Sequence, residues 1–492
     1  MGTSGIKDFY LYSKVFITGG TGFMGKILVE KLLRSTEVSM LYLLIREKRG
    51  KTAHQVLDLL LQDKIFNKMK EICPNYRQKI QLVQGDCSVS GLGLGTSDRQ
   101  MLISNTDIIF HLAATVRFNA DLKTAYRINV CGTKDLILLA KQMGNLKSFV
   151  HVSTAYSNFP VNYIQEKLYD MPESLEEMCQ TIEKLDEDYI NKYTERIIEP
   201  WPNTYTFTKA IAEMVIKNGA DQLPIGVFRP SVVMPTYREP IASWTDNLNG
   251  PSGICLGIIK GILKLGPCDH NESLADLVPV DMCVNGLLAS AWDISAKRNS
   301  SIPETTPVYN YVCGADKSPI RWRELLKISA VYGRKYVDNS ANIFVIFTNF
   351  AMCHWVLDMV YHIIPAFFMD MFLFLRGKRM RLLSTHRKIR KMFILLSPVY
   401  TNTWNFDNDN ITRLWNRTNE RDREHFPFSL QDVNWNNYFA SYIRGLKEQF
   451  HVKPINLSHW FAIFWQLLKI LLVFFTCNTV ISKYQSVAEI YY

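Results

Sequence analysis

The chain has 492 residues, more than one compact core usually holds, so two or more packed units are expected. Hydrophobic residues make up 47% of the chain, and the formal net charge of +10 predicts an anionic partner, either a phosphate-bearing ligand or an anionic membrane surface. Nucleic acid ranks last among such partners, because the sequence has no RNA-binding signature, zinc-finger spacing or Arg-rich tail.

The first 300 residues alternate short β-rich runs with stretches of helical periodicity. The helical stretches include residues 25–34 and 126–143. Nearly continuous apolar runs indicate strands that are buried on both faces, so the alternation predicts a doubly wound α/β domain with a parallel sheet. The expected strands are KVFITG at 14–19, SMLYLLIR at 39–46, KIQLVQGD at 79–86, DIIFHLAA at 107–114, KSFVHVST at 147–154 and IGVFRPS at 225–231.

The first strand runs into a glycine-rich turn, VFITGGTGFMG at 15–25, and a helix opens at Phe23. Gly20, Gly22 and Gly25 satisfy GxGxxG, while Gly19, Gly22 and Gly25 satisfy the GxxGxxG spacing. Either match alone would fit a simple tight turn. Between a strand and a helix, however, such glycines let a pyrophosphate approach the backbone at the helix N-terminus. The turn therefore predicts a dinucleotide site.

The end of the second expected strand indicates which dinucleotide binds. An NAD site places Asp or Glu there to bind the ribose, whereas this chain has Arg46. A guanidinium suits a 2′-phosphate, so we expect NADPH rather than NADH. The alternative is that Arg46 is only a solvated strand end.

A catalytic group is expected where NTYTFTKAIAE begins a helix. Tyr205 and Lys209 are four residues apart and therefore share one face of that helix. A nearby ammonium lowers the pKa of a phenol, so Tyr205 could protonate a carbonyl oxygen as hydride arrives, with Lys209 also holding the nicotinamide ribose. Thr154, or its neighbour Ser153, ends an expected strand and could bind the same oxygen. YxxxK alone is common on surface helices.

Together these motifs resemble an extended short-chain dehydrogenase/reductase, over roughly the first 290 residues. The matching residues are TGGTGFMG, Gly85-Asp86, HLAA at 111–114, Asn129, Thr154, Tyr205, Lys209 and RPS at 229–231. The resemblance implies a Rossmann sheet in which Asp86 contacts adenine and Pro230 and Ser231 flank the nicotinamide. The other cofactor-binding residues that it implies are Gly19, Thr21, Gly22, Phe23, Met24, Gly25, Ala113, Ala114 and Asn129.

Within that superfamily the chain looks like the alcohol-forming fatty acyl-CoA reductases, on the motifs HLAATVRFNA, HVSTAYSN and VFRPSVV. The tail, with FDNDNITRLW, resembles that family's male sterility domain. The resemblance implies that NADPH reduces a long-chain acyl-CoA to an aldehyde and then to a fatty alcohol and free CoA. We therefore expect a reductase domain at 12–300 and a mainly helical, membrane-associated domain at 340–450.

Two apolar segments of the C-terminal third suggest contact with a membrane. Residues 342–375 could rest on a membrane, form an acyl-chain tunnel or be buried core, and we favour membrane contact. Residues 459–481 are long enough to span a bilayer, although Lys469 near the middle weakens this prediction. Between these segments, residues 376–391 hold eight Lys or Arg and no acid, which fits either a juxtamembrane cluster or a solvated helix face.

The cellular setting is less closely defined by the sequence. The ten cysteines form no CxxC pair, which predicts reduced thiols in a catalytic domain that faces the cytosol. We expect the membrane of the endoplasmic reticulum or the peroxisome, and no metal, because His111, His151 and His459 are not spaced as ligands. A homo-oligomer is left open. Two rival functions are a membrane-associated reductase of sterols or nucleotide-sugars and a non-catalytic NADP-binding or lipid-binding scaffold.

Overall fold

The computed structural model describes residues 4–452, apart from 172–173, 221, 267–272, 299–304, 315–319, 338–342, 378, 380 and 403, together with Gln466 and Val473. The chain forms two compact units, each built from separate stretches of sequence. Unit 1 comprises Met1–Asn247, Leu274–Ile320 and Asn402–Tyr442. Unit 2 comprises Leu248–Ser273, Arg321–Thr401 and Ile443–Tyr492.

A seven-stranded parallel sheet forms the centre of unit 1, in the order β10-β7-β5-β4-β1-β2-β3. The order starts at β1, moves outward to β3 and then reverses across β4, so the sheet is doubly wound. The predicted fold class is confirmed. The strands are β1 (Lys14–Thr18), β2 (Met40–Ile45), β3 (Ile80–Gln84), β4 (Ile108–His111), β5 (Ser148–Val152), β7 (Ile225–Pro230) and β10 (Val308–Tyr311).

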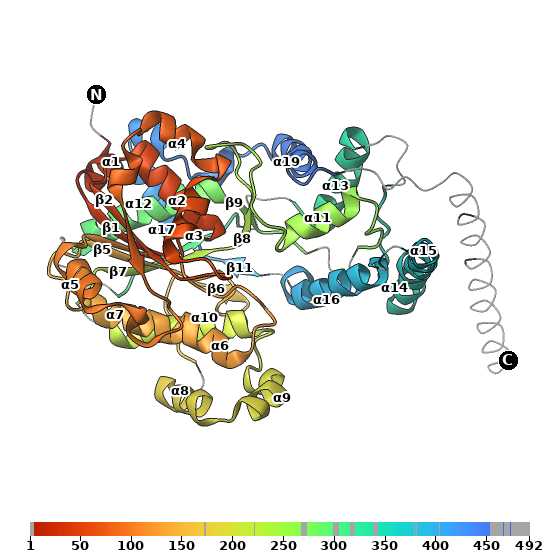
Figure 1. The fold of residues 1–492 in the computed structure, drawn as a ribbon, viewed down its shortest axis with the longest axis horizontal. Helices are drawn as coiled ribbons and strands as arrows, with labels where there is room; N and C mark the ends of the chain where they lie inside the picture. The colour runs from red at the N-terminus through yellow and green to blue at the C-terminus, as the bar shows by residue number, and fades with distance from the viewer. Residues whose placement is uncertain are drawn as a thin grey trace. The chain divides into compact units, whose positions relative to one another are not determined.

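Helices cover both faces of this sheet, as Figure 1 shows. On one face, α2 (Phe23–Ser35) and α12 (Val280–Arg298) pack together in one apolar cluster. On the other, α7 (Gly132–Ala140) and α10 (Thr204–Gly219) pack together in a second cluster. Every residue of β4, β5, β7 and β10 is buried. This burial on both faces explains the continuous apolar runs of the sequence.

Shorter elements complete unit 1. They are α1 (Gly5–Tyr10), α3 (Ala53–Leu61), α4 (Asn67–Ile72), α5 (Thr96–Asn105), α6 (Leu122–Tyr126), η4 (Arg127–Cys131), α8 (Leu175–Lys184), α9 (Glu187–Ile197), α17 (Asp409–Arg417) and α18 (Glu420–His425). Two further strands, β8 (Val232–Met234) and β9 (Leu277–Pro279), pair in parallel beside the main sheet.

A late stretch of the chain returns to unit 1 and pairs with an early one. Strand β11 (Asn405–Phe406) lies parallel to β6 (Tyr163–Ile164). Glu166 fixes this return, because its carboxylate accepts the backbone N–H of Asn310 at 2.9 Å and that of Asn410 at 2.5 Å. Burial raises the pKa of Glu166 to about 8, against the lowering effect of these two bonds. Residues 402–442 are thus an integral part of unit 1.

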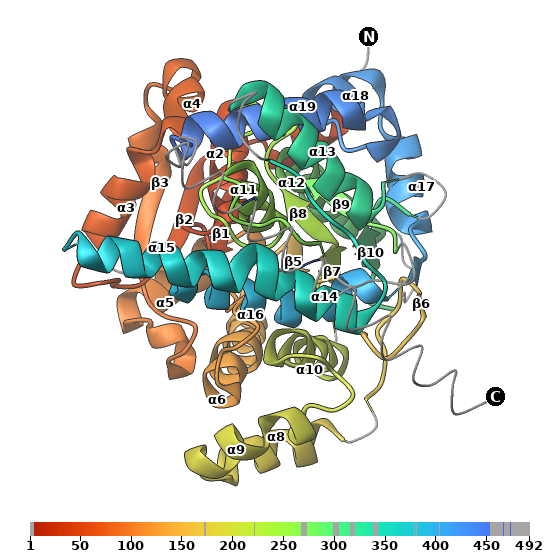
Figure 2. The ribbon, with the colours of Figure 1, turned by 90° about the vertical axis from the view of Figure 1, so that its right-hand side faces the viewer.

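Unit 2 is helical in its described residues. It contains α11 (Pro251–Ile259), α13 (Trp322–Tyr336) and α16 (Leu382–Thr401), and α19 (Trp435–Gln449) ends in it. In Figure 2, α14 (Ala351–Asp358), η5 (Met359–Ile363) and α15 (Ile364–Leu375) follow one another as one helical run.

The helical run Ala351–Leu375 is long and apolar enough to cross a membrane, the one such helix among the described residues. Length and composition are weak evidence for a span, because core helices of soluble proteins pass the same test. The predicted anchor at 459–481 lies outside the described residues, apart from Gln466 and Val473.

We predict that Glu166→Ala destabilises unit 1. The substitution leaves the N–H groups of Asn310 and Asn410 without their acceptor, which costs about 1–3 kcal/mol per buried group. Thermal or denaturant unfolding should show a loss of at least ~2 kcal/mol. Glu195→Ala, at an exposed position of α9, is the control and should unfold like the unchanged protein. Equal stability of the two variants would contradict the role given to Glu166.

Candidate active site

The glycine turn brings three backbone segments into contact at the carboxyl end of β1. Gly19 has a φ of +76°, and a Cβ there would lie 2.6 Å from the backbone nitrogen of Ala113. A Cβ on Gly25 would overlap the carbonyl oxygen of Gly19, so α2 can pack against the turn only without a side chain. A Cβ on Gly22, by contrast, would approach only the Gly19 oxygen, at 3.2 Å. The fold therefore requires glycine at positions 19 and 25. At Gly22, the missing side chain leaves space beside the turn.

That space lies at the N-terminus of α2. Gly22 is the N-cap residue, is itself exposed, and gives the helix no side-chain cap. The first N–H groups of α2 therefore have no partner from the cap and face the space that Gly22 leaves, where the helix dipole favours an anion. Thr21, Phe23 and Met24 are half-buried around this turn, and Phe23 stacks on Trp244. The turn therefore fits the phosphates of a dinucleotide.

A cation and a carboxylate lie at the ends of the next two strands. Arg46 directly follows β2, and its Nη1 lies 3.1 Å from Oδ2 of Asp86, which follows β3. The guanidinium is about half exposed, so the ion pair does not remove it from solvent. Burial raises the pKa of Asp86, but bonds from Ser88 and Arg46 outweigh burial and lower it. Both side chains follow strands on the same side of the sheet as β1, at its carboxyl edge, and a contact of either with a bound cofactor stays a prediction.

The loop after β4 forms another wall of the same edge. Ala113 and Ala114 are half-buried in this loop, and the N–H of Ala113 donates to Thr18 at the end of β1. Asn129 is fully buried, and its amide joins the N–H of Thr115 to the hydroxyl of Thr208 on α10. Asn129 thus holds the loop against α10. A direct contact between Asn129 and the cofactor stays a prediction.

Tyr205 and Thr154 meet at the end of β5. Tyr205 lies in the first turn of α10, whose N-cap Asn203 accepts the N–H of Thr206 at 2.9 Å. Burial raises the pKa of Tyr205 to about 12, and its hydrogen bond with Thr154 acts in the opposite direction. The two hydroxyls that were expected to bind one carbonyl oxygen therefore do lie together.

Lys209 lies one helical turn further along α10. Its ammonium is buried and donates to the carbonyl oxygen of Val152 at 2.7 Å. Burial lowers its pKa to about 8, while the charge of Glu213 raises it. Lys209 therefore remains largely protonated at neutral pH. A pKa-lowering effect of Lys209 on Tyr205, which the sequence suggested, stays a prediction.

Ser153 has a different role from its neighbour Thr154. Its hydroxyl donates to Glu213 at 2.5 Å, and the same carboxylate forms two hydrogen bonds with the guanidinium of Arg229. All three residues are buried. Of the two hydroxyls considered from the sequence, Thr154 is therefore the one placed at Tyr205. The Glu213–Arg229 pair was missed, although Glu213 lies four residues after Lys209, a spacing that places both on one face of α10.

Pro230 and Ser231 end β7, beside β5. Ser231 donates its hydroxyl to Asp276 at 2.6 Å, and the carbonyl of Pro230 accepts the N–H of Ala155. Because β1, β4, β5 and β7 are parallel neighbours, their carboxyl ends meet at one edge of the sheet. A phenol, a hydroxyl and an ammonium thus lie along the same edge as the glycine turn. Such a set can bind a carbonyl oxygen and deliver a proton to it.

Comparison with known proteins agrees with this geometry. The chain is 43% identical to the fatty acyl-CoA reductase wat of Drosophila melanogaster, over 90% of this chain and 85% of that protein. It is 35% identical to human fatty acyl-CoA reductase 1, again over 90% and 85% of the two chains. The chain belongs to the fatty acyl-CoA reductase family. Residues 17–287 and 361–453 of this reductase each match a family model described as male sterility protein.

Solved structures show the same fold for the reductase at low sequence identity. The terminal R domain of the myxalamid biosynthetic pathway superposes with a TM-score of 0.61 at 19% identity, over 90% of this chain and 93% of that one. The reductase domain of a nonribosomal peptide synthetase from Mycobacterium tuberculosis gives a TM-score of 0.57 at 18% identity, over 88% and 92%. The likeness extends beyond the nucleotide-binding half.

Two glycine substitutions in the reductase should separate fold from ligand binding. Gly22→Ala brings its methyl group to 3.2 Å from the Gly19 carbonyl oxygen, a tight contact that a small local shift relieves, so the protein should fold with nearly unchanged thermal stability and lose at least ~10-fold in dinucleotide affinity by calorimetry. Gly25→Ala forces its Cβ onto the Gly19 carbonyl and should yield misfolded protein. Full dinucleotide affinity in Gly22→Ala would contradict the placement of the phosphates.

Proposed function

We propose that this protein reduces long-chain fatty acyl-CoA to fatty alcohol and free CoA through an aldehyde, with NADPH as the reductant. The observation that carries the proposal is the placement of the Tyr205 phenol beside the Thr154 hydroxyl, at the sheet edge that also holds the glycine turn. Its relatives from fly and human are named fatty acyl-CoA reductases, which supports the substrate class. Intact Tyr205, Thr154 and Lys209 speak against a non-catalytic scaffold.

The residues of this edge divide the chemistry between them. A nicotinamide nucleotide, when bound, supplies the hydride. The hydroxyls of Tyr205 and Thr154 bind the carbonyl oxygen of the thioester and stabilise its developing negative charge. Loss of CoA thiolate then leaves an aldehyde, and in the second reduction the phenol of Tyr205 donates its proton to the alkoxide. Lys209, fixed by the Val152 carbonyl one helical turn from Tyr205, places a positive charge that would stabilise the phenolate left when Tyr205 has donated its proton, until the phenol is reprotonated from solvent.

Arg46 supports the choice of NADPH over NADH. The end of β2 bears a half-exposed guanidinium rather than an acid, and a doubly charged phosphate is a better partner for it than a ribose hydroxyl. The ion pair with Asp86 orients the guanidinium, which stays about half exposed to solvent.

The apolar helical run of unit 2 and the basic residues after it support contact with a lipid membrane. We place the protein on the endoplasmic reticulum or peroxisomal membrane, with its catalytic unit facing the cytosol. Long-chain substrates partition into such membranes, so a membrane-bound reductase would meet them where they accumulate.

Tyr205→Phe tests the proposed reaction. Membranes containing the protein, given palmitoyl-CoA and NADPH, should form hexadecanol, and the variant should lose about 10²–10⁴-fold in kcat because it lacks the proton donor. Tyr189→Phe, at an exposed position of α9, should keep full activity. Unchanged alcohol formation by Tyr205→Phe would refute the mechanism, and turnover of a hydroxysteroid instead of palmitoyl-CoA would favour the rival sterol reductase.

Arg46→Ala tests the cofactor choice. Removal of a charge-assisted hydrogen bond worth about 1.5–3 kcal/mol should raise the KM for NADPH by roughly 10- to 100-fold and leave that for NADH nearly unchanged. Steady-state kinetics with both nucleotides measure the effect. Lys51→Ala removes an exposed charge from the same loop and should change neither constant. An equal effect on both nucleotides would show that Arg46 does not read the 2′-phosphate.

A further inference from the structure

The helical run Ala351–Leu375 has an exposed apolar face. An apolar stripe follows one side of the run at intervals that keep its members on one helix face. Four of its members, Met352, Trp355, Phe367 and Phe374, have between 54% and 64% of their surface exposed. The apolar stripe comprises Met352, Trp355, Ile363, Phe367, Met371 and Phe374.

The buried side of the run holds Val360 and Ala366 together with three polar residues. Asp358, His362 and Asp370 are each more than nine-tenths buried, and they recur every four or eight residues. Buried charges need partners, because removal from water is costly when it is not compensated by hydrogen bonds. Both acids find those partners within unit 2.

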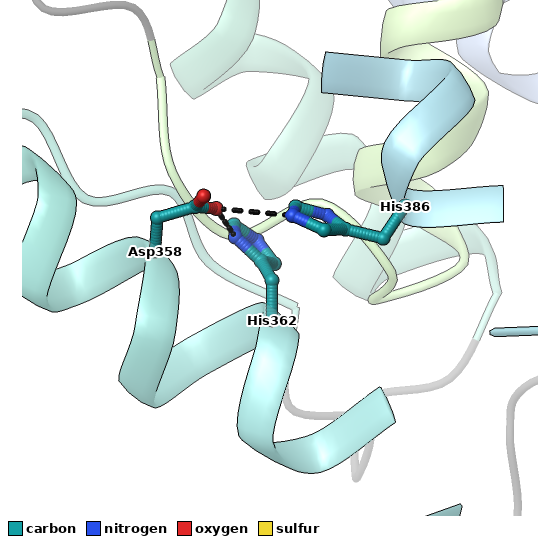
Figure 3. A group of neighbouring side chains, drawn as sticks. All are labelled: Asp358, His362 and His386. Carbon is teal, nitrogen blue, oxygen red and sulfur yellow. Dashed lines mark hydrogen bonds and ion pairs between the residues drawn. The ribbon is translucent and has the colours of Figure 1, made fainter. Parts of the chain in front are cut away.

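Asp358 is held by two histidines, as Figure 3 shows. Its Oδ1 lies 2.8 Å from Nδ1 of His362, and Nε2 of His386 on α16 lies 3.3 Å from the same oxygen. Nε2 of His362 accepts the backbone N–H of Lys264 at 2.9 Å, so the ring proton must be on Nδ1 and points to Asp358.

This tautomer argues against a metal ion, although one ligand atom from each of the three residues lies within 4.8 Å of the others. A metal-bound histidine donates its second ring N–H, whereas the second nitrogen of His362 is an acceptor. The cluster therefore joins the helical run to α16 through the close approach of His386 to Asp358 and through Arg390 of α16, whose guanidinium lies 3.7 Å from Oδ2 of Asp358.

Asp370 makes a second tie to the same helix. Its two carboxylate oxygens accept the backbone N–H groups of Arg381, Leu382 and Leu383 at 2.9 to 3.0 Å. These groups open α16 and would otherwise lack partners. The two acids thus fix the run against α16.

An ordinary amphipathic helix of a water-soluble protein turns its apolar residues to the core, whereas this run leaves large apolar side chains exposed while it buries two acids. A long exposed apolar stripe marks a surface that another apolar phase covers. The neighbouring charges indicate which phase: residues 376–391 contain eight Lys or Arg and no acid. Arg379, Arg381, Arg387 and Lys388 are all exposed, and such a cluster attracts anionic lipid headgroups.

We propose that Ala351–Leu375 lies flat in the interface of an anionic membrane, with the apolar stripe inserted and α16 above it, and does not span the bilayer. If the run spanned the bilayer, α16 would enter the hydrocarbon with it, because Asp358 and Asp370 of the run hold α16 in place. The exposed cations of α16 would then lie in hydrocarbon as well. This inference specifies the surface behind the proposed membrane association, and it stands independently of acyl-CoA reduction.

A depth measurement on the full chain tests the proposal. Cys268, Cys353 and Cys477 are replaced by Ser, and single cysteines are introduced by Met352→Cys, Ile363→Cys and Phe374→Cys for an environment-sensitive fluorophore. The protein is reconstituted in phosphatidylcholine vesicles with and without phosphatidylserine, with lipids quenching at shallow or deep positions. A matched label at Val331→Cys, exposed on α13 of the same unit, is the control.

We expect all three stripe labels to be quenched at one shallow depth, about 5–10 Å below the headgroups, and Val331→Cys to remain unquenched. The double change Arg387→Gln and Lys388→Gln should weaken quenching in phosphatidylserine vesicles, by about fivefold in insertion per lost charge. A deep label at 363 between shallow labels at 352 and 374 would instead show a span. Labels unquenched by any lipid would refute the proposal, as would burial of the stripe in a second copy of the chain, detected by crosslinking. Acyl-CoA reduction by the same samples in detergent reports separately on the proposed function.

Discussion

The arrangement of the active site depends on one ion pair that lies wholly out of water. Glu213 of α10 and Arg229 of β7 form two hydrogen bonds with each other, and the Glu213 carboxylate also accepts hydrogen bonds from Ser153, Ser157 and Asn158. Two charges without water are unfavourable unless such bonds are complete. In this site these hydrogen bonds are complete. The pair therefore holds α10, β7 and the end of β5 in fixed positions relative to one another.

Each catalytic group lies a short distance along the chain from this pair. Tyr205 and Lys209 lie two turns and one turn before Glu213 on α10, and Thr154 follows Ser153. The charge of Glu213 also raises the pKa of Lys209 against the effect of burial. The same contact thus helps to fix the position of α10, which carries the proposed proton donor Tyr205, and raises the pKa of Lys209 on the same helix.

The sequence predicted the features that arise from local chemistry. Glycine spacing after a buried strand located the tight turn at the start of α2, and the four-residue spacing of Tyr205 and Lys209 placed both on one helix face. The motif could not choose between Ser153 and Thr154, because the choice depends on which hydroxyl meets Glu213 across the sheet. The spacing from Lys209 could point to Glu213 but not to its partner, because Glu213 and Arg229 are 16 residues apart on different elements and only the fold brings them into contact. In the tail, hydropathy alone could not tell an exposed apolar face from a buried one; the partners of Asp358 and Asp370 made that distinction.

The parallel pairing of β11 with β6 has a consequence for biosynthesis. Some 240 residues of chain separate the two strands. The hydrogen bond from the Asn410 N–H to the carboxylate of Glu166 can therefore form only after those residues have been synthesised. The nucleotide-binding sheet can therefore assemble early at the ribosome, but its unit cannot close until almost the entire polypeptide has emerged. Until β11 has been synthesised, the edge of β6 that pairs with it is exposed to chaperones and to incorrect pairing partners.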